Sequence, residues 1–194
     1  MLELGSEEER RAAELEVATL AKLDHPSVVA YHEHFLYEDA AAGQSLCLVM
    51  AYCEGGDLAR LIKTHAEKVP MAYFGEPQIL TWFVQMSMAL HYVHSKGILH
   101  RDLKSQNIFL SHGHAKLGDF GIVKVLDGSV TSAHTVIGTP YYLSPEVCKA
   151  QKYSYMSDVW SLGCVLYELC ALQQAWTGNN LLAVVYKIVQ ASHP

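Results

Sequence analysis

The sequence predicts an α+β fold, in which one helix and two strands precede a mainly helical region that carries small hairpins. Two observations support this prediction. Early in the chain, apolar residues alternate with polar ones, as they do in half-buried strands, whereas later apolar residues recur at helical spacing. The two strands follow each other directly, so the pattern does not favour a parallel α/β sheet.

The first expected element is a helix. Ser6 and Glu9 have the spacing of a capping box, and a helical pattern runs from them to about Leu23. His25 and Pro26 should end this helix, because proline cannot continue the backbone hydrogen bonds.

Two strands are expected next, at residues 27–35 and 45–50, and a small, flexible AAAG loop joins them. Pro77 then suits the first position of a long helix, and Gly97 suits its end. Residues 108–110 should form a strand that leads into a turn. Further loops are expected at residues 38–44, 69–76 and 127–135.

Length and composition indicate one globular unit, because 51% of the 194 residues are hydrophobic and can form a core. The net charge of −6 gives no electrostatic footprint for nucleic acid or for an anionic membrane surface. Residues 159–172 are the most apolar, but Glu168 interrupts them and they fall short of the roughly 20 residues of a membrane span. We therefore expect a buried helix there, and neither nucleic acid nor membrane as a partner.

The N-terminal residues lack a long apolar core after basic residues, so we expect neither a signal peptide nor a membrane anchor. The five cysteines form an odd set without a CxxC pair, which is typical of reduced thiols. We interpret them as structural and expect a cytoplasmic or nuclear protein. The oligomeric state is left open by the sequence.

Residues 100–121 read HRDLKSQNIFLSHGHAKLGDFG, which places Asp102, Asn107 and Asp119 on loops around one short hairpin. A carboxylate that accepts a proton, together with oxygen ligands for magnesium, is what a phosphoryl-transfer site requires. The alternative is a set of ordinary turns, because Asp, Asn and Gly favour turns through local hydrogen bonds. Several motifs in register favour the site over the turns.

Four blocks occur in the order that protein kinases share. They are HRDLKSQN, LGDFG, GTPYYLSPE (138–146) and SDVWSLGCVLYELCAL (157–172). On these motifs the chain resembles a serine/threonine protein kinase, and with MAYCEGGDL (50–58) it is similar to the NIMA-related kinases. The resemblance implies a protein-kinase-like fold over residues 1–194, with a partial small lobe (1–50), a hinge (51–56) and an incomplete, mainly helical large lobe (57–194).

The resemblance implies a role for each polar residue of these motifs. Asp102 would accept or orient the proton of the substrate hydroxyl, and Asn107 and Asp119 would be ligands of Mg²⁺. Lys104 would neutralise the γ-phosphate of ATP. Lys104 together with Thr139 is the pattern of serine/threonine kinases, so the acceptor is expected to be Ser or Thr.

The segment from Met50 to Cys53 resembles the hinge that binds adenine through backbone groups. Ala51 departs from the acidic residue that is common at its position, but the relevant contact is a carbonyl, which alanine also has. Met50 would be the gatekeeper residue and Phe109 would pack beneath the base. The alternative for both side chains is ordinary core packing.

Other parts of the kinase pattern are missing. Glu16 corresponds to the helix glutamate that pairs with a strand lysine, yet no lysine precedes it; the alternative is a solvated helix-face residue. Only Gly5 occurs before Gly43, so the glycine-rich loop is absent, and no arginine follows Arg101 to pair with Glu146. We therefore expect a chain truncated at both ends of the catalytic domain.

By resemblance, Thr135 is the phosphorylation site of the activation segment. Arg101 would bind the phosphate in a charge-assisted pair and tie the segment to the catalytic loop. The alternative is an ordinary exposed loop threonine.

Asp158 is either the N-cap of its helix or, as in the family, a carboxylate that braces the catalytic loop. His112 and His114 form an HxH pair, but they flank a glycine in a turn without other ligand types nearby, which favours a turn over a metal site. The other paired histidines are interpreted as strand-face or helix-face residues: His32, His34, His91 and His94.

Two functions from different classes follow. The first is a fragment of an active kinase that uses ATP and Mg²⁺ to phosphorylate protein substrates; the second is a catalytically silent, kinase-like protein-binding module. Retention of the catalytic motif residues favours the first. Association with the cytoskeleton, centrosomes or cilia is implied by the family resemblance alone.

Overall fold

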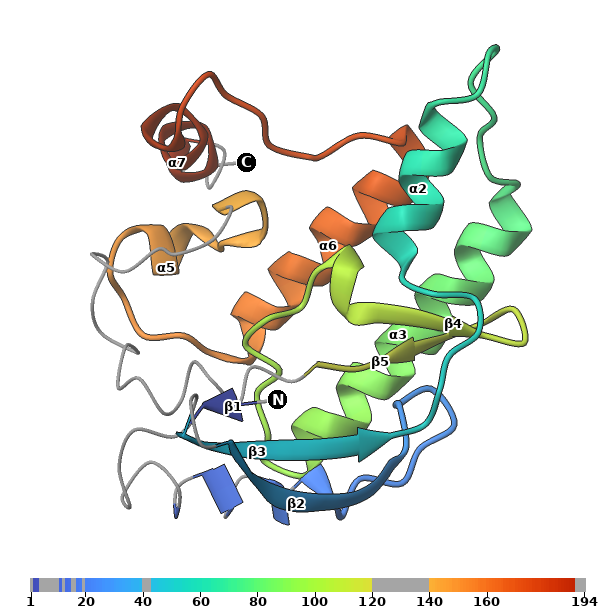
Figure 1. Ribbon diagram of the computed structural model, residues 1–194. Coiled ribbons are helices and arrows are strands. Elements are labelled where there is room, and N and C mark those ends of the chain that lie inside the picture. The colour runs from blue at the N-terminus through green and yellow to red at the C-terminus, as the bar shows by residue number, and fades with distance from the viewer. Residues whose placement is uncertain are drawn as a thin grey trace.

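The computed structural model describes residues 2–3, 11, 13–14, 17–18, 20–39, 43–119 and 140–190. In this part of the chain, a small antiparallel sheet lies at one end of the molecule, beside the helical residues between 11 and 20, and the later helices extend toward the other end (Figure 1). The described residues between 11 and 20 are helical, and residues 21–22 form a turn at the predicted end of the first helix. This segregation of strands and helices confirms the α+β class.

The sheet contains three strands in the order β1–β3–β2, which are β1 (Leu2–Glu3), β2 (Tyr31–Asp39) and β3 (Gly43–Met50). β2 and β3 are antiparallel, and Leu36 is paired with Leu46. The loop predicted over residues 38–44 is shorter than expected, because the ladder extends to the pair Asp39 and Gly43.

The stretch before β2 is not a regular strand, although the alternating pattern predicted one over residues 27–35. Val28 forms a parallel bridge with Leu117, and the Val29 N–H donates to the Leu117 carbonyl at 2.8 Å. The Leu117 N–H donates in turn to the Ser27 carbonyl at 2.8 Å. The apolar residues of this stretch are therefore buried against the second hairpin rather than against the sheet.

The second hairpin pairs β4 (Ile108–Ser111) with β5 (His114–Leu117), as the sequence predicted. Its two-residue turn places His112 and Gly113 at φ 50° and 79°. Positive φ at both central positions is the geometry that matches the twist of the flanking strands. Asn107 and Asp119 lie just outside the two ends of this hairpin, which brings them to the same place.

The helices of the described region are α2 (Leu58–Ala66), α3 (Glu76–Ser95), α5 (Pro145–Cys148), α6 (Tyr155–Ala171) and α7 (Leu181–Gln190). α3 begins with Pro77 in its first turn, and Gly97 follows its end at φ 75°, both as predicted. The sequence pattern missed α2. None of the helices in the described ranges is long and apolar enough to cross a membrane.

One hydrophobic core connects the sheet to the helices. It runs from Val17 of the first helix and Leu46 of β3 through Met86 of α3 to Leu169 of α6, all fully buried. Each fully buried side chain of this size stabilises the fold by about 1.5–3 kcal/mol. The segments that carry the catalytic motifs are therefore held by a continuous core.

α6 carries a stripe of polar residues that are buried: Ser157, Asp158, Ser161 and Glu168. Its N-cap is Ser154, which forms a capping box with Ser157, so the N-cap alternative for Asp158 is wrong. Asp158 lies inside the first turn, where its carboxylate is directed into the protein. The polar stripe faces the loops that flank the helix.

Glu168 accepts a hydrogen bond from the Tyr142 hydroxyl at 2.7 Å. Tyr142 lies in a 3₁₀ turn (Pro140–Tyr142), and because it has one O–H, the Ser105 hydroxyl donates to it at 2.8 Å. Burial raises the pKa of Glu168 above its ordinary value, and burial together with the Glu168 carboxylate raises the pKa of Tyr142. The sequence had marked Glu168 only as an interruption of an apolar run.

We expect Glu168→Gln to stabilise the protein more at neutral than at acidic pH. Folding raises the pKa of Glu168, so the native state binds this proton more tightly than the unfolded chain does. Its stabilising contribution is complete below about pH 4.5, the ordinary value, and is lost as the pH rises through the folded pKa. Glutamine does not titrate. Urea unfolding gives the free energy of unfolding of both proteins at pH 4.5 and at pH 7. The difference between the variant and the wild type should be more favourable to the variant at pH 7 than at pH 4.5, by more than about 0.5 kcal/mol.

Glu67→Gln is the matched control, because Glu67 pairs with Lys63 on the surface of α2 and its side chain is 66% exposed. A stability difference between Glu168→Gln and the wild type that is the same at both pH values would contradict the prediction.

Candidate functional site

The catalytic loop follows α3 and ends where β4 begins. Asp102 and Lys104 are paired, with Lys104 Nζ 2.7 Å from Asp102 Oδ2. The Asn107 amide donates to the same carboxylate oxygen and to the Asp102 backbone carbonyl, each at 2.9 Å. Asn107 is buried in a 3₁₀ turn (Ser105–Asn107), so its orientation is fixed by packing as well as by these bonds.

Asp119 follows β5 and lies beside Asn107. The Asn107 amide donates to the Asp119 carbonyl at 3.3 Å, and the Gly118 N–H donates to the Asn107 carbonyl at 3.0 Å. Asp119 is exposed and adopts φ 46°, a conformation that non-glycine residues rarely adopt. One amide side chain therefore connects Asp102 with Asp119.

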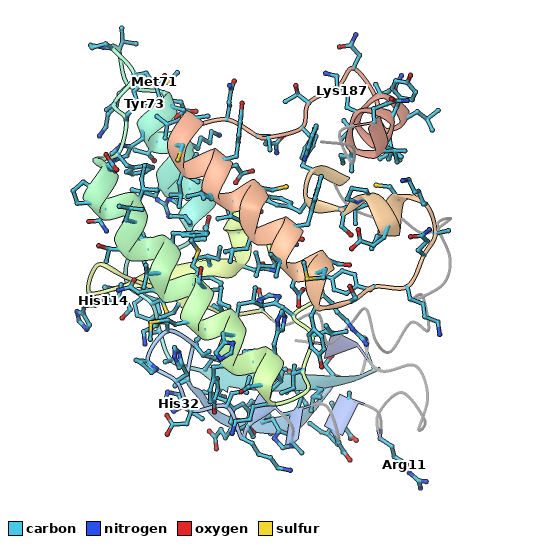
Figure 2. All side chains as sticks on the ribbon, turned by 180° about the vertical axis from the view of Figure 1, so that it is seen from behind. Arg11, His32, Met71, Tyr73, His114 and Lys187 are labelled. Atoms are coloured by element: carbon cyan, nitrogen blue, oxygen red, sulfur yellow. The ribbon has the colours of Figure 1, made fainter. Side chains whose placement is uncertain are left out.

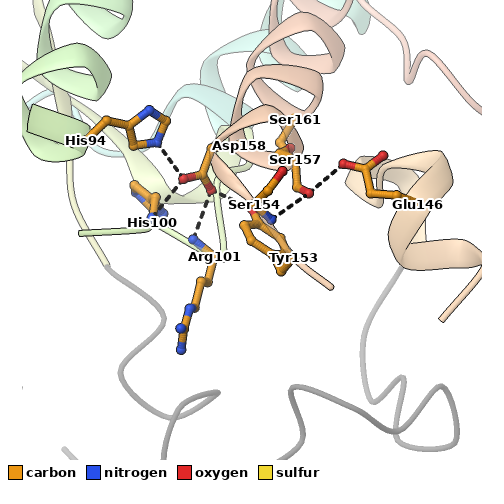
Figure 3. Close-up of polar contacts among 9 residues, drawn as sticks. All are labelled: His94, His100, Arg101, Glu146, Tyr153, Ser154, Ser157, Asp158 and Ser161. Atoms are coloured by element: carbon orange, nitrogen blue, oxygen red, sulfur yellow. Dashed lines mark hydrogen bonds and ion pairs between the residues drawn. The ribbon is translucent and has the colours of Figure 1, made fainter. Parts of the chain in front are cut away.

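Asp158 holds the backbone at the start of the catalytic loop (Figure 3). Its carboxylate accepts the N–H of His100 at 2.9 Å and the N–H of Arg101 at 3.0 Å. His94 of α3 approaches it through Nε2 at 2.8 Å, and the Tyr153 hydroxyl donates to the other oxygen. Asp158 is fully buried, so these contacts are made away from solvent.

His94 was missed by the sequence interpretation, which treated it as an ordinary helix-face residue. It does lie on α3, but its ring contacts the buried carboxylate of Asp158. The only sequence signal was its position six residues before the HRD motif, and helical periodicity cannot distinguish such a contact from solvent exposure. Burial lowers the pKa of the adjacent His100, and burial together with Asp158 raises the pKa of Tyr153.

The hinge residues lie at the junction between the sheet and the second hairpin. The Ala51 N–H donates to the Ala30 carbonyl at 2.8 Å, and the Cys53 thiol lies 4.0 Å from the Ala51 carbonyl oxygen. Burial raises the pKa of the Cys53 thiol. Met50 and Phe109 are half-buried, and neither belongs to the described hydrophobic core, which disfavours the core-packing alternative.

Gly118 lets Phe109 approach the backbone just before Asp119. A Cβ atom at Gly118 would lie 2.9 Å from the Phe109 ring and 2.9 Å from a methyl group of Val29. Real Cβ atoms do not come this close, so this position requires glycine. The glycine therefore lets the Phe109 ring and Val29 both pack against the backbone directly before Asp119.

The residues around Asn107 fit a magnesium ion. Because its Nδ2 donates to Asp102 and Asp119, the side-chain oxygen of Asn107 remains as an acceptor with no partner among the described residues. The exposed carboxylate of Asp119 is a second hard oxygen donor. No cluster of three His, Cys, Asp or Glu residues occurs in the described ranges, so a caged metal site is not formed there. Magnesium suits such a site, because it uses few protein ligands together with phosphate oxygens.

Other predicted site residues have different surroundings. Glu146, for which the sequence offers no arginine, accepts a hydrogen bond from the Ser157 hydroxyl at 2.6 Å. The backbone of Arg101 is held at φ 63°, and its guanidinium points away from Asp158 (Figure 3). Glu16, Thr135 and Thr139 lie outside the described residues.

The paired histidines do not gather into a metal site in the described ranges. His112 contacts Glu54, and His114 contacts Gln85 of α3. His32 and His34 are exposed on β2, as expected; Figure 2 shows His32 at the sheet and His114 at the hairpin turn.

The comparisons with known proteins agree with this geometry. Residues 2–193 match the protein kinase domain. The chain is 52% identical over 190 residues to the serine/threonine-protein kinase Nek1 of Mus musculus, covering 97% of this chain and 15% of that protein. It is 50% identical over 186 residues to Nek5 of Homo sapiens (95% of this chain, 25% of that protein) and 44% identical over 182 residues to Nek11 of Homo sapiens (94% and 27%).

The chain thus spans between 15% and 27% of the length of these three relatives. The α+β fold, the kinase motifs and the domain match over nearly all residues agree. This chain belongs to the protein kinase family, as a serine/threonine protein kinase domain homologous to the NIMA-related (Nek) kinases.

Proposed function

We propose that this chain is the catalytic part of a kinase that transfers the γ-phosphate of ATP to Ser or Thr of protein substrates. Protein kinases generally use ATP and Mg²⁺. One observation carries the proposal: the Asn107 amide binds both Asp102 and Asp119, which gathers the proton acceptor and the metal-ligand candidates at one point. Ordinary turns would not require this buried connection.

In the proposed mechanism, the Asp102 carboxylate accepts or orients the proton of the substrate hydroxyl as its oxygen attacks the γ-phosphorus. Asn107 holds this carboxylate in one orientation through its Nδ2. Lys104 shares the same carboxylate oxygen and carries a flexible ammonium group, which can turn to the γ-phosphate once substrate is present. The positive charge then offsets negative charge that develops on the transferring group.

Asn107 and Asp119 would hold magnesium when nucleotide is bound. When bound, magnesium would supply positive charge that offsets the charge of the phosphates. The protein's own contribution is to fix the two oxygen donors. The Gly118 N–H and the Asn107 carbonyl form a 3.0 Å bond between the segments that carry them.

The hinge supports adenine binding through the backbone. The Ala51 N–H is already bound to the Ala30 carbonyl, whereas the Cys53 N–H has no partner among the described residues. Within the described ranges, the Ala51 carbonyl has only the long contact of the Cys53 thiol. These two backbone groups therefore offer one acceptor and one donor to a purine edge, and Phe109 and Met50 line the same region.

The regulatory role of Thr135 also belongs to this proposal. One guanidinium nitrogen of Arg101, Nη1, is buried and has no hydrogen-bond partner among the described residues. A phosphate on the activation segment would satisfy it with a charge-assisted bond. The substrates, the protein partners and a cytoplasmic setting are likewise proposals; the setting is supported by five cysteines that are all free thiols.

The test is calorimetric titration of the purified chain with MgATP. We expect binding that depends on magnesium, and we expect Asp119→Ala to abolish that dependence because it removes a ligand of the ion. Asp39→Ala is the matched control, because Asp39 lies at the end of β2, outside the candidate site.

Folded protein that binds no MgATP would contradict the proposed function for this chain and favour the silent binding module. If binding occurs, phosphorylation of a generic Ser/Thr substrate is measured next, and loss of phosphate transfer in Asp102→Asn with retained nucleotide binding is expected. The substitution keeps the shape of the side chain but removes the proton acceptor.

A second prediction concerns the brace on the catalytic loop. Asp158→Asn replaces one acceptor oxygen by an NH₂ group, which cannot accept from the backbone N–H or the side-chain donors now bound there. We expect a loss of about 2–4 kcal/mol in the free energy of unfolding, measured by urea denaturation, because buried donors lose their partner. Asp57→Asn is the control: Asp57 caps α2 by accepting the Arg60 N–H at 2.8 Å, and asparagine caps helices equally well. If the two substitutions lowered the free energy of unfolding equally, the proposed role of Asp158 in holding the catalytic loop would be contradicted.

A further inference from the structure

The C-terminal part of the hinge is attached to the edge of β4. The Gly55 N–H donates to the Leu110 carbonyl and the Leu110 N–H donates to the Gly56 carbonyl, each at 2.9 Å. Asp57 forms an antiparallel bridge with Phe109. β4 is thus paired on both of its edges, with β5 on one side and residues 55–57 on the other.

Glu54 adds a side-chain contact at the end of this pairing. Its carboxylate accepts the Ser111 hydroxyl at 3.1 Å and the His112 N–H, and His112 Nδ1 lies 3.4 Å from it. The backbone bond from His112 is the main cause that lowers the pKa of Glu54, so the carboxylate is the form that makes these contacts. The side chain therefore connects the hinge to the β4–β5 turn.

These contacts place the hinge between two fixed points. At one end, the Ala51 N–H is bound to the Ala30 carbonyl; at the other, Gly55 and Glu54 are bound to the hairpin. Between them lie only Tyr52, which is exposed, and Cys53. The direction of the Ala51 carbonyl and the Cys53 N–H therefore depends on where residues 54–55 are held.

The close approach of Gly55 explains why a side chain is needed to fix this position. A Cβ atom at Gly55 would lie 2.7 Å from Leu110 Cβ, so only glycine lets this segment approach β4 so closely. Gly55 is exposed and has no side chain that could anchor the segment, so the pairing can open from this side. Glu54, with two acceptor oxygens, adds contacts to consecutive residues of the turn and resists this opening.

We propose that Glu54 is a positioning residue for the adenine-binding hinge, which it holds in register with β4. This inference rests on the proposed nucleotide binding by the hinge. Asn107 and Asp119 flank the same hairpin, so Glu54 also sets the adenine-binding groups relative to the magnesium ligands. Its contribution is to base recognition rather than to the phosphate end.

The test compares wild type, Glu54→Ala and Glu54→Gln by calorimetry with two probes, MgADP and magnesium tripolyphosphate. We expect Glu54→Ala to weaken MgADP binding about three- to tenfold, the range expected for lost hydrogen bonds, and to leave tripolyphosphate binding within about twofold. Glu54→Gln should restore most of the affinity, because its amide oxygen can still accept the His112 N–H while its NH₂ group donates to the Ser111 hydroxyl, which can also accept. Glu67→Ala, at the exposed end of α2, is the matched control and should change neither probe.

Equal weakening of both probes would overturn the inference, because it would show a general loss of structure. Unchanged MgADP affinity in Glu54→Ala would also overturn it. A Gly55→Ala variant provides an independent check: its methyl group would push the segment off β4, and MgADP should weaken while tripolyphosphate does not.

Amide hydrogen exchange separates this inference from the proposed function. In nucleotide-free protein, the Gly55 and Leu110 amides should exchange at least about fivefold faster in Glu54→Ala than in wild type or Glu67→Ala. If wild type binds neither probe, the proposed function fails, and the exchange rates alone decide whether Glu54 holds the hinge. Unchanged rates would overturn the inference.

Discussion

The candidate site depends on one buried carboxylate that accepts hydrogen bonds from two backbone N–H groups. Asp158 binds the amides of His100 and Arg101, the two residues directly before Asp102. Arg101 adopts φ 63°, and a left-handed conformation costs a non-glycine residue about 1–2 kcal/mol. Two hydrogen bonds to a carboxylate, each worth about 1.5–3 kcal/mol, offset that cost. The geometry of the catalytic loop is thus maintained from α6, an element far from it in sequence.

The two halves of the site are brought together by the β4–β5 hairpin. Asn107 precedes β4 and Asp119 follows β5, so antiparallel pairing places them at the same end. The hinge pairs with the outer edge of β4, and residues 27–29 pair with Leu117 of β5. The backbone proposed to bind the base, the metal-ligand candidates and the proposed proton acceptor are therefore positioned by one hairpin with four residues in each strand and by its neighbours. A shift in register of this hairpin would move all of them.

The sequence predicted what depends on local pattern. Helical spacing with Pro77 and Gly97 located α3, and the His112–Gly113 turn located the hairpin. It extended a strand through residues 27–30, because alternation cannot show which partner a strand finds, and here the partner is β5. It assigned no partner to His94 and missed Tyr142 and Ser105, because their contacts join residues that are far apart in sequence. Such pairings are set by tertiary packing, which the periodicity of the sequence does not report.

The polar residues of α6 show why the site needs such pairings. The loops that carry the candidate catalytic groups have irregular backbones, and their buried N–H and C=O groups must find partners outside regular structure. Ser157 binds Glu146, Ser161 binds the Tyr142 carbonyl at 2.9 Å, and Glu168 binds the Tyr142 hydroxyl. Together with Asp158, they make one face of a mainly apolar helix into a row of acceptors and donors. Replacing any one of these polar residues by an apolar residue would make α6 more uniformly apolar, but it would leave a polar group of a loop without its partner. The interruption of the hydrophobic pattern is therefore the cost of holding an irregular loop in one conformation.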